Sequence, residues 1–223
     1  MSYSRFPIYF IPPEGPLADF GAAWLGWNVV TGRVAAQPEV SGLRDITMTP
    51  MKYGFHGTLK PPFRLADGMS VEALETAVGE LAASLKPAAC DRLALTTLGG
   101  FLALTPQGDA TGLRRIADAC VRDLDRFRAP APDAELARRR QAGLTDRQEA
   151  LLTQWGYPYV MEEFRFHLTL SGRLPTADIA HWSAVVEQHL PPITTPFPID
   201  QIALCGERSD GRFELIQRYA LTG

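Results

Sequence analysis

The spacing of apolar and polar positions divides the chain into short strands and amphipathic helices. Strands are expected where apolar residues alternate with polar ones or run together between turn residues, and helices where apolar residues recur at three-and-four spacing. The predicted strands and hairpins are residues 6–11, 91–105 and 198–220, and the predicted helices are residues 17–27, 71–86, 113–127 and 177–190. This alternation of strands and helices predicts an α+β fold.

Two of the four histidines occupy the same place in a repeated five-residue phrase, Phe-His-x-Thr-Leu, at residues 55–59 and 166–170. Successive side chains of a strand point to opposite faces, so each segment places His and Thr on a polar face and Phe and Leu on an apolar one. In each half of the chain the phrase is followed by an amphipathic helix and then by a hairpin. We therefore predict a duplicated unit with one His strand in each of two lobes and a cleft between them.

The paired motifs indicate an active site in that cleft. His56 and His167 supply two proton-transfer groups, and Thr58 and Thr169 supply two hydroxyl donors. A single histidine on a half-exposed strand is more often structural than functional. The matched threonine two residues further on reverses that preference for the pair, whereas the other two histidines lack such partners and are interpreted as structural.

Other kinds of site have little support. The polar faces of the two motifs hold one acidic neighbour, Glu163, and the chain has no His-x-His pair, so we expect no metal site. The three cysteines are far apart and show no paired spacing, which argues against a disulfide framework or a zinc site. There is no Gly-x-Ser-x-Gly elbow and no Gly-rich phosphate loop. No cofactor is expected.

Composition and charge narrow the choice of partners. Hydrophobic residues make up 46% and charged residues 21% of the chain, as in ordinary globular proteins. A net charge of −3 and a pI near 5.8 provide no basic field to attract long nucleic acids. No stretch approaches the length of a membrane span, and the apolar run near the N-terminus is too short for a signal peptide. We expect a reduced, cytoplasmic protein with no membrane and no protein partner.

Residues 129–156 interrupt the repeat. Prolines mark a loop, an Arg-rich helical stretch follows, and Thr145 with Gln148 forms a capping box for another helix. We predict a helical insertion at 129–156 within a single bilobal domain of residues 1–223. The run 138–140, three arginines, is interpreted as a solvated helix face, with a substrate clamp as the alternative.

These motifs and their surroundings resemble the 2H phosphoesterase superfamily, and in particular a little-characterised branch whose members are often encoded beside phosphonate-utilisation genes. The resemblance is carried by residues 53–63, 135–140, 155–159, 163–170 and 172–174. Gly57 departs from it, since the family usually places an apolar residue there. The resemblance implies a bilobed α+β fold in which two antiparallel sheets face each other across a cleft, with helices on the outside.

The resemblance also implies metal-independent hydrolysis or ligation of cyclic or 2′-linked phosphodiesters. Opening a cyclic phosphodiester needs a water deprotonated on one side and a leaving alkoxide protonated on the other, which one neutral imidazole and one imidazolium can do. Thr58 and Thr169 would bind the non-bridging phosphate oxygens. Lys60 and Arg165, on the same faces, are the candidate secondary substrate contacts.

Three functions remain open at this stage. The first is a hydrolase that opens a small sugar or nucleotide cyclic phosphate in phosphonate metabolism. The second is processing of RNA 2′,3′-cyclic phosphate ends or 2′-5′ ligation, with a short RNA as substrate, against which the acidic pI argues. The third is a non-catalytic nucleotide-binding module, which would not need two proton-transfer groups. The sequence does not assign the base and the acid.

Overall fold

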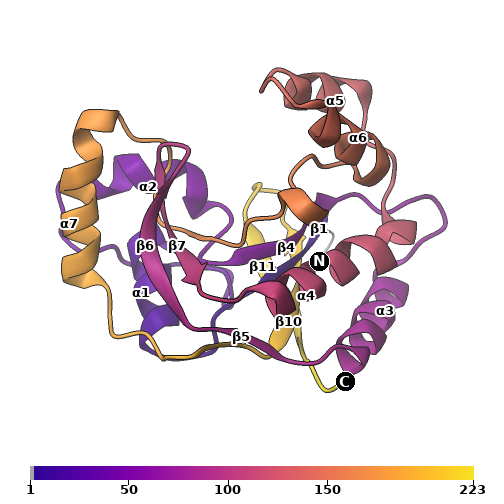
Figure 1. The fold of residues 1–223 in the computed structure, drawn as a ribbon, viewed down its shortest axis with the longest axis horizontal. Helices are drawn as coiled ribbons and strands as arrows, with labels where there is room; N and C mark the ends of the chain where they lie inside the picture. The colour runs from indigo at the N-terminus through magenta and orange to yellow at the C-terminus, as the bar shows by residue number, and fades with distance from the viewer. Residues whose placement is uncertain (1–2) are drawn as a thin grey trace.

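The computed structural model describes residues 3–223 and has an α+β fold (Figure 1). It is built on one antiparallel sheet of seven strands, whose order in the sheet differs from their order in the sequence. The strands follow the order β11-β10-β1-β4-β8-β7-β6. Their bounds are β1 (Phe6–Phe10), β4 (Gly57–Phe63), β6 (Arg92–Leu98), β7 (Phe101–Gln107), β8 (Leu168–Thr169), β10 (Gln201–Glu207) and β11 (Phe213–Ala220). Two small ribbons pair β2 (Trp27–Asn28) with β3 (Arg33–Val34) and β5 (Ala88–Cys90) with β9 (Phe197–Ile199).

The helices lie close to the predicted positions. They are α1 (Pro16–Leu25), α2 (Leu43–Met51), α3 (Val71–Ser84), α4 (Thr111–Asp123), α5 (Asp133–Arg140), α6 (Asp146–Trp155) and α7 (Ile179–His189). The capping box of α6 is confirmed, because the Thr145 hydroxyl accepts from the Gln148 amide and the Gln148 side chain accepts from the Thr145 amide. The helix predicted at 113–127 ends earlier, at Asp123, and a 3-10 turn follows it. No element was predicted where α2 lies.

Each half of the sheet pairs strands from distant parts of the chain. The first motif leads into β4, which pairs with β1, and β1 pairs with the β10–β11 hairpin near the end of the chain. The second motif leads into β8, which pairs with β7 of the β6–β7 hairpin from the middle of the chain. The β6–β7 hairpin, which follows the first motif in sequence, therefore lies beside the second motif, and the β10–β11 hairpin lies on the side of the first motif, separated from β4 by β1. The halves meet at one register pair, Gly57 with Leu168.

Helices pack on the strands at both ends of the sheet. On the right of Figure 1, α3 packs on β10 and β11 and α4 packs on β4. On the left, α7 packs on β6 and β7. The α5–α6 pair stands apart from the sheet (Figure 1), and α6 rests on α4 through a small apolar cluster of Val121, Leu151 and Val160. Within residues 3–223, none of the helices has both the length and the apolar character needed to cross a bilayer.

Candidate active site

The alternation predicted for the two motifs is present in the structure. In the second motif Phe166, Leu168 and Leu170 are buried, whereas His167 and Thr169 are only half-buried. The first motif follows the same pattern. Each histidine precedes its strand by one residue and does not lie within it, since β4 begins at residue 57 and β8 at residue 168.

Gly57 is required by the way the two motifs cross. A Cβ atom built on Gly57 would lie 2.3 Å from Cε2 of Phe166, closer than any ordinary carbon contact. Phe166 is itself buried and packs edge-on against Phe10 at a centroid distance of 5.9 Å. The departure from the family pattern at position 57 therefore makes room for the aromatic ring of the other motif.

His56 is held by its backbone and by aromatic rings. Its Nδ1 donates to the carbonyl of Gly54 at 2.9 Å, and its Nε2 lies 3.0 Å from Oγ1 of Thr58. With the proton on Nδ1, Nε2 accepts from the Thr58 hydroxyl. The ring of Tyr9 stacks on the imidazole at a centroid distance of 3.6 Å and an interplanar angle of 25°. These contacts fix the ring and leave Nε2 as its basic atom.

His167 has the same local geometry. Its Nδ1 donates to the carbonyl of Arg165, two residues earlier, at 2.7 Å. Phe101 lies beside the ring at a centroid distance of 5.5 Å. Both histidines therefore direct the Nδ1 proton toward a carbonyl of their own backbone, which leaves Nε2 as the unprotonated ring nitrogen.

Burial lowers the pKa of both imidazoles. The pKa of His56 falls to about 4, because burial disfavours its charged form; the bond to the Gly54 carbonyl opposes this shift, and charge on His167 adds to it. Burial also lowers the pKa of His167, against the opposing effect of the Arg165 carbonyl. A proton on one ring thus disfavours a proton on the other, and the pair prefers one charged imidazole at most.

Two cavities bring the four predicted residues together in crossed pairs. The first, which we call the His56 cavity, has a volume of about 290 Å³ and is lined by His56 together with Thr169. The second, the His167 cavity, has a volume of about 490 Å³ and is lined by His167 together with Thr58. Phe101 lines both. Each cavity therefore combines the histidine of one motif with the threonine of the other.

The His167 cavity has an aromatic wall and a contribution from α6. Tyr157, Tyr159 and Phe101 line it, and Arg165 lies at the same cavity. Gln148 lines it as well, so the helical segment at 129–156 reaches the candidate site. Tyr157 and Tyr159 belong to the 155–159 segment of the family resemblance, but neither they nor Phe101 were predicted as site residues, because their contribution depends on how the segments pack.

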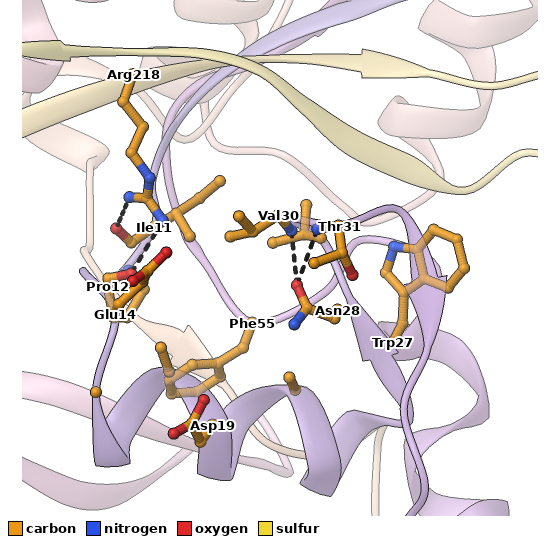
Figure 2. Close-up of a pocket in the computed structure, with 14 residues that line it drawn as sticks. Ile11, Pro12, Glu14, Asp19, Trp27, Asn28, Val30, Thr31, Phe55 and Arg218 are labelled. Carbon is orange, nitrogen blue, oxygen red and sulfur yellow. Dashed lines mark hydrogen bonds between the residues drawn. The ribbon is translucent and has the colours of Figure 1, made fainter.

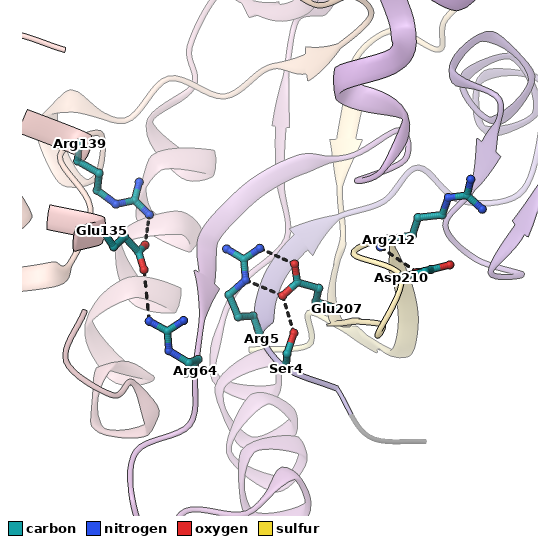
Figure 3. Close-up of polar contacts among 8 residues, drawn as sticks. All are labelled: Ser4, Arg5, Arg64, Glu135, Arg139, Glu207, Asp210 and Arg212. Carbon is teal, nitrogen blue, oxygen red and sulfur yellow. Dashed lines mark hydrogen bonds and ion pairs between the residues drawn. The ribbon is translucent and has the colours of Figure 1, made fainter. Parts of the chain in front are cut away.

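The Arg138–Arg140 run is engaged mainly within its own segment. Arg139 donates to Glu135 of the same helix at 2.6 Å, and Glu135 also accepts from Arg64 at 3.4 Å (Figure 3). The guanidinium of Arg139 lies 4.8 Å from the ring centroid of Tyr157, and Arg140 donates to Glu149 at 2.7 Å. The Arg64–Glu135 contact joins α5 to the chain after β4, and the Arg139 guanidinium packs on the ring of Tyr157.

Lys60 lies away from both cavities. Its side chain is buried beneath α4, where Nζ donates to the carbonyl of Val121 at 2.9 Å and lies 3.5 Å from Oδ1 of Asp125. Burial lowers its pKa to about 8, with Asp125 opposing the shift. The polar face of β4 was expected to be open along its length, but α4 covers this end of it. Lys60 therefore serves the packing of α4 on β4.

A third cavity, of about 310 Å³, lies beside α1 and contains neither motif histidine (Figure 2). Two of its polar side chains, Arg218 and Asn28, bind the protein's own backbone. Arg218 donates to the carbonyls of Ile11 at 2.7 Å and Pro12 at 3.2 Å. The side-chain oxygen of Asn28 accepts from two backbone amides of the following turn. These contacts stabilise the local backbone.

Metal ligands do not cluster in the described part of the chain. Residues 3–223 contain no group of three or more His, Cys, Asp or Glu side chains placed to hold an ion. All three cysteines are buried and unpaired as disulfides.

Comparison with known families gives one match over most of the chain. A family model described as "Protein of unknown function (DUF1045)" matches residues 58–214. The matched range includes the second motif and begins at the threonine of the first.

Two curated proteins are similar to this chain in sequence. "Ribose 1,5-bisphosphate phosphokinase PhnN" of Janthinobacterium sp. (strain Marseille) is 37% identical over 221 residues, which are 94% of this chain and 49% of the relative. The protein of the same name from Laribacter hongkongensis (strain HLHK9) is 35% identical over 190 residues, 83% of this chain and 44% of the relative. The chain thus spans about half the length of the curated relatives it matches.

Two solved structures align along nearly all of the chain at low identity. E. coli LigT in apo form is 13% identical with a TM-score of 0.47, over 100% of each chain. TT0787 of Thermus thermophilus is 14% identical with a TM-score of 0.48, over 98% of each chain.

Proposed function

This chain belongs to the DUF1045 family, and we propose that it is a phosphodiesterase that opens a cyclic phosphate on a small sugar. The observation that carries the proposal is the crossed pairing of two histidines and two threonines around two adjoining cavities. Each histidine has Nδ1 bound to its own backbone and Nε2 left for proton transfer. Two such groups supply both proton transfers of a phosphodiester hydrolysis without requiring a metal ion.

We assign His56 as the general base. Its pKa of about 4 keeps it neutral near pH 7, and its Nε2 already accepts a hydroxyl proton from Thr58 at 3.0 Å. In the reaction Nε2 takes a proton from water, and the water oxygen forms a bond to phosphorus. The Thr58 hydroxyl then donates its hydrogen bond to a non-bridging phosphate oxygen in place of His56 Nε2.

His167 is the general acid in this scheme. Burial lowers its pKa, but an anionic phosphodiester in the cavity favours the imidazolium and raises the pKa again in the complex. The bond between phosphorus and the leaving sugar oxygen breaks, and His167 Nε2 delivers its proton to that oxygen. The product is a phosphomonoester with a free hydroxyl on the neighbouring carbon.

The threonines stabilise the charge that develops on the phosphorus centre. Thr58 and Thr169 come from opposite cavities, so their hydroxyls approach the phosphate from two sides. Loss of one donor at such a position costs roughly 100- to 1000-fold in rate in other enzymes. We expect a loss toward the lower end here, because a hydroxyl is a neutral donor.

The names of the relatives support a ribose phosphate as the substrate class. They are called ribose 1,5-bisphosphate phosphokinases, and this chain corresponds to about half of each. A phosphate on C1 of ribose can come from opening a ring that bridges C1 and the adjacent C2 hydroxyl. We therefore propose ribose 5-phosphate 1,2-cyclic phosphate as substrate and ribose 1,5-bisphosphate as product, in keeping with the expected link to phosphonate metabolism.

A nucleotide 2′,3′-cyclic phosphate is the second candidate. The tyrosines of the His167 cavity favour it, because aromatic rings stack on nucleobases. An RNA end would use the same subsite for its terminal base.

The test is hydrolysis of both substrates by purified protein in the presence of EDTA. We expect turnover of the ribose compound, and a loss of about 100-fold or more in His56→Ala and in His167→Ala. His181→Ala, which removes an exposed histidine of α7, is the matched control. Loss of activity in EDTA, or full activity in either motif variant, would overturn the proposal.

A further inference from the structure

We infer that Arg173 binds a second phosphate group of the substrate, so that the His56 cavity selects a phosphorylated pentose over an unphosphorylated one. This inference rests on the proposed function and concerns the same site. Arg173 lines the His56 cavity together with His56 and Thr169, and its side chain is exposed. Arg173 lies in the 172–174 segment of the family resemblance, but it was not among the predicted site residues.

Arg173 is free to bind an anion. Among residues 3–223 it takes part in no ion pair and no side-chain hydrogen bond, in contrast to Arg139 and Arg140, which pair with glutamates. The described residues that line the His56 cavity include no aspartate or glutamate. A guanidinium without a competing carboxylate is well suited to bind phosphate through two parallel hydrogen bonds.

The backbone around Arg173 is held in place on both sides. The amide of Gly172 donates to the carbonyl of Ile46 at 2.6 Å, and the amide of Leu174 donates to the carbonyl of Gly100 at 2.7 Å. The stem of Arg173 lies over Gly100, where an added Cβ would be 3.4 Å from Cγ of the arginine. The arginine stem therefore packs against the β6–β7 turn, while its residue lines the His56 cavity.

The two cavities differ in the ligand that they favour. The His167 cavity is larger and is lined by a carboxylate, Glu163, as well as by Arg165, and the negative charge of Glu163 weakens the attraction for a second phosphate. The His56 cavity, at about 290 Å³, is at the small end of ligand sites and suits a sugar phosphate better than a nucleotide. The second phosphate of the substrate is therefore placed at Arg173.

The experiment compares two substrates that differ only in the second phosphate, ribose 5-phosphate 1,2-cyclic phosphate and ribose 1,2-cyclic phosphate. The quantity measured is the ratio of their kcat/KM values. We expect Arg173→Ala to reduce this ratio about 10- to 100-fold, as for the loss of a charge-assisted hydrogen bond, and Arg173→Lys to restore part of it. Arg33→Ala, at an exposed arginine of β3 that lines neither cavity, should keep the wild-type ratio.

The outcomes separate the two proposals. An equal loss on both substrates would overturn the inference, because Arg173 would then act on the shared cyclic phosphate or on the fold. A fall of the ratio in Arg165→Ala alone would place the second phosphate in the other cavity. No turnover of either substrate by the wild type would refute the proposed function. Calorimetry with ribose 1,5-bisphosphate would then decide: binding weakened in Arg173→Ala supports the inference, and absent or unchanged binding overturns it.

Discussion

Lowering the pH should remove a defined part of the folding free energy through His56. The imidazole lies against the rings of Tyr9 and Tyr53, and burial lowers its pKa to about 4, with the Gly54 carbonyl opposing the shift and charge on His167 adding to it. In an unfolded chain the pKa of histidine is about 6.5. Between these two values the unfolded chain binds a proton that the folded protein does not, so acidification favours unfolding.

The size of the effect follows from the difference between the two pKa values. The full contribution of neutral His56 is present above pH 6.5 and is lost progressively toward pH 4. Since one pKa unit corresponds to about 1.4 kcal/mol, the loss relative to pH 7 is about 2 kcal/mol at pH 5 and about 3 kcal/mol at pH 4. His56→Gln has no imidazole to protonate and should not show this loss.

Urea denaturation of the wild type and of His56→Gln at pH 7, 5 and 4 measures this loss of unfolding free energy. The free energy of unfolding of the variant, relative to that of the wild type, should improve by about 2 kcal/mol between pH 7 and pH 5. His181→Gln removes an exposed histidine and should follow the wild type. If His56→Gln and the wild type lost stability in parallel, His56 would not be held neutral by burial, and its assignment as the base would lose its support.

Three further predictions concern catalysis and packing. The pH profile of kcat/KM should be bell-shaped. As pH rises, kcat/KM should increase when His56 loses its proton near pH 4, and it should decrease again when His167 loses its proton, with a midpoint lower than 6.5 because burial lowers the pKa of His167. An optimum above pH 7 would contradict the assignment. Gly57→Ala places a methyl group 2.3 Å from the Phe166 ring and should lower the free energy of unfolding by about 1–3 kcal/mol in urea titrations, whereas an unchanged midpoint would show that the ring can move. Lys60→Ala should cost about 2–4 kcal/mol of stability by leaving buried partners unpaired, and Lys60→Met less. In the Met variant kcat/KM should change by no more than about twofold, because the structure places Lys60 outside both cavities; a large loss would show that it contacts substrate.

Local signals in the sequence were enough for most helices and hairpins. The helix at Val71–Ser84 was predicted because its apolar residues keep helical spacing, and in the structure the Ser70 hydroxyl caps it by accepting from the amide of Ala73. The hairpins at β6–β7 and β10–β11 were predicted from turn residues between apolar strands. In contrast, α2 was missed, because its composition is barely apolar and Pro50 lies within it.

The pairing of distant segments had no such signal. Sequence order suggested that each motif would lie with the hairpin that follows it, whereas β8 pairs with β7 and β1 pairs with β10. The aromatic rings beside the histidines, Tyr9 and Phe101, come from other strands and carry no motif. Such contacts arise from burial and hydrogen bonding of the whole sheet, which local patterns do not contain.

The sequence by itself determined that two histidines and two threonines would lie on the polar faces of two extended segments, because side-chain alternation is a property of the local backbone. Only the tertiary structure decided that His56 would share a cavity with Thr169 and His167 with Thr58. It also decided that Lys60, on the same predicted face, would be buried under α4. Which side of a strand is covered depends on the elements packed against it, and these come from distant parts of the chain.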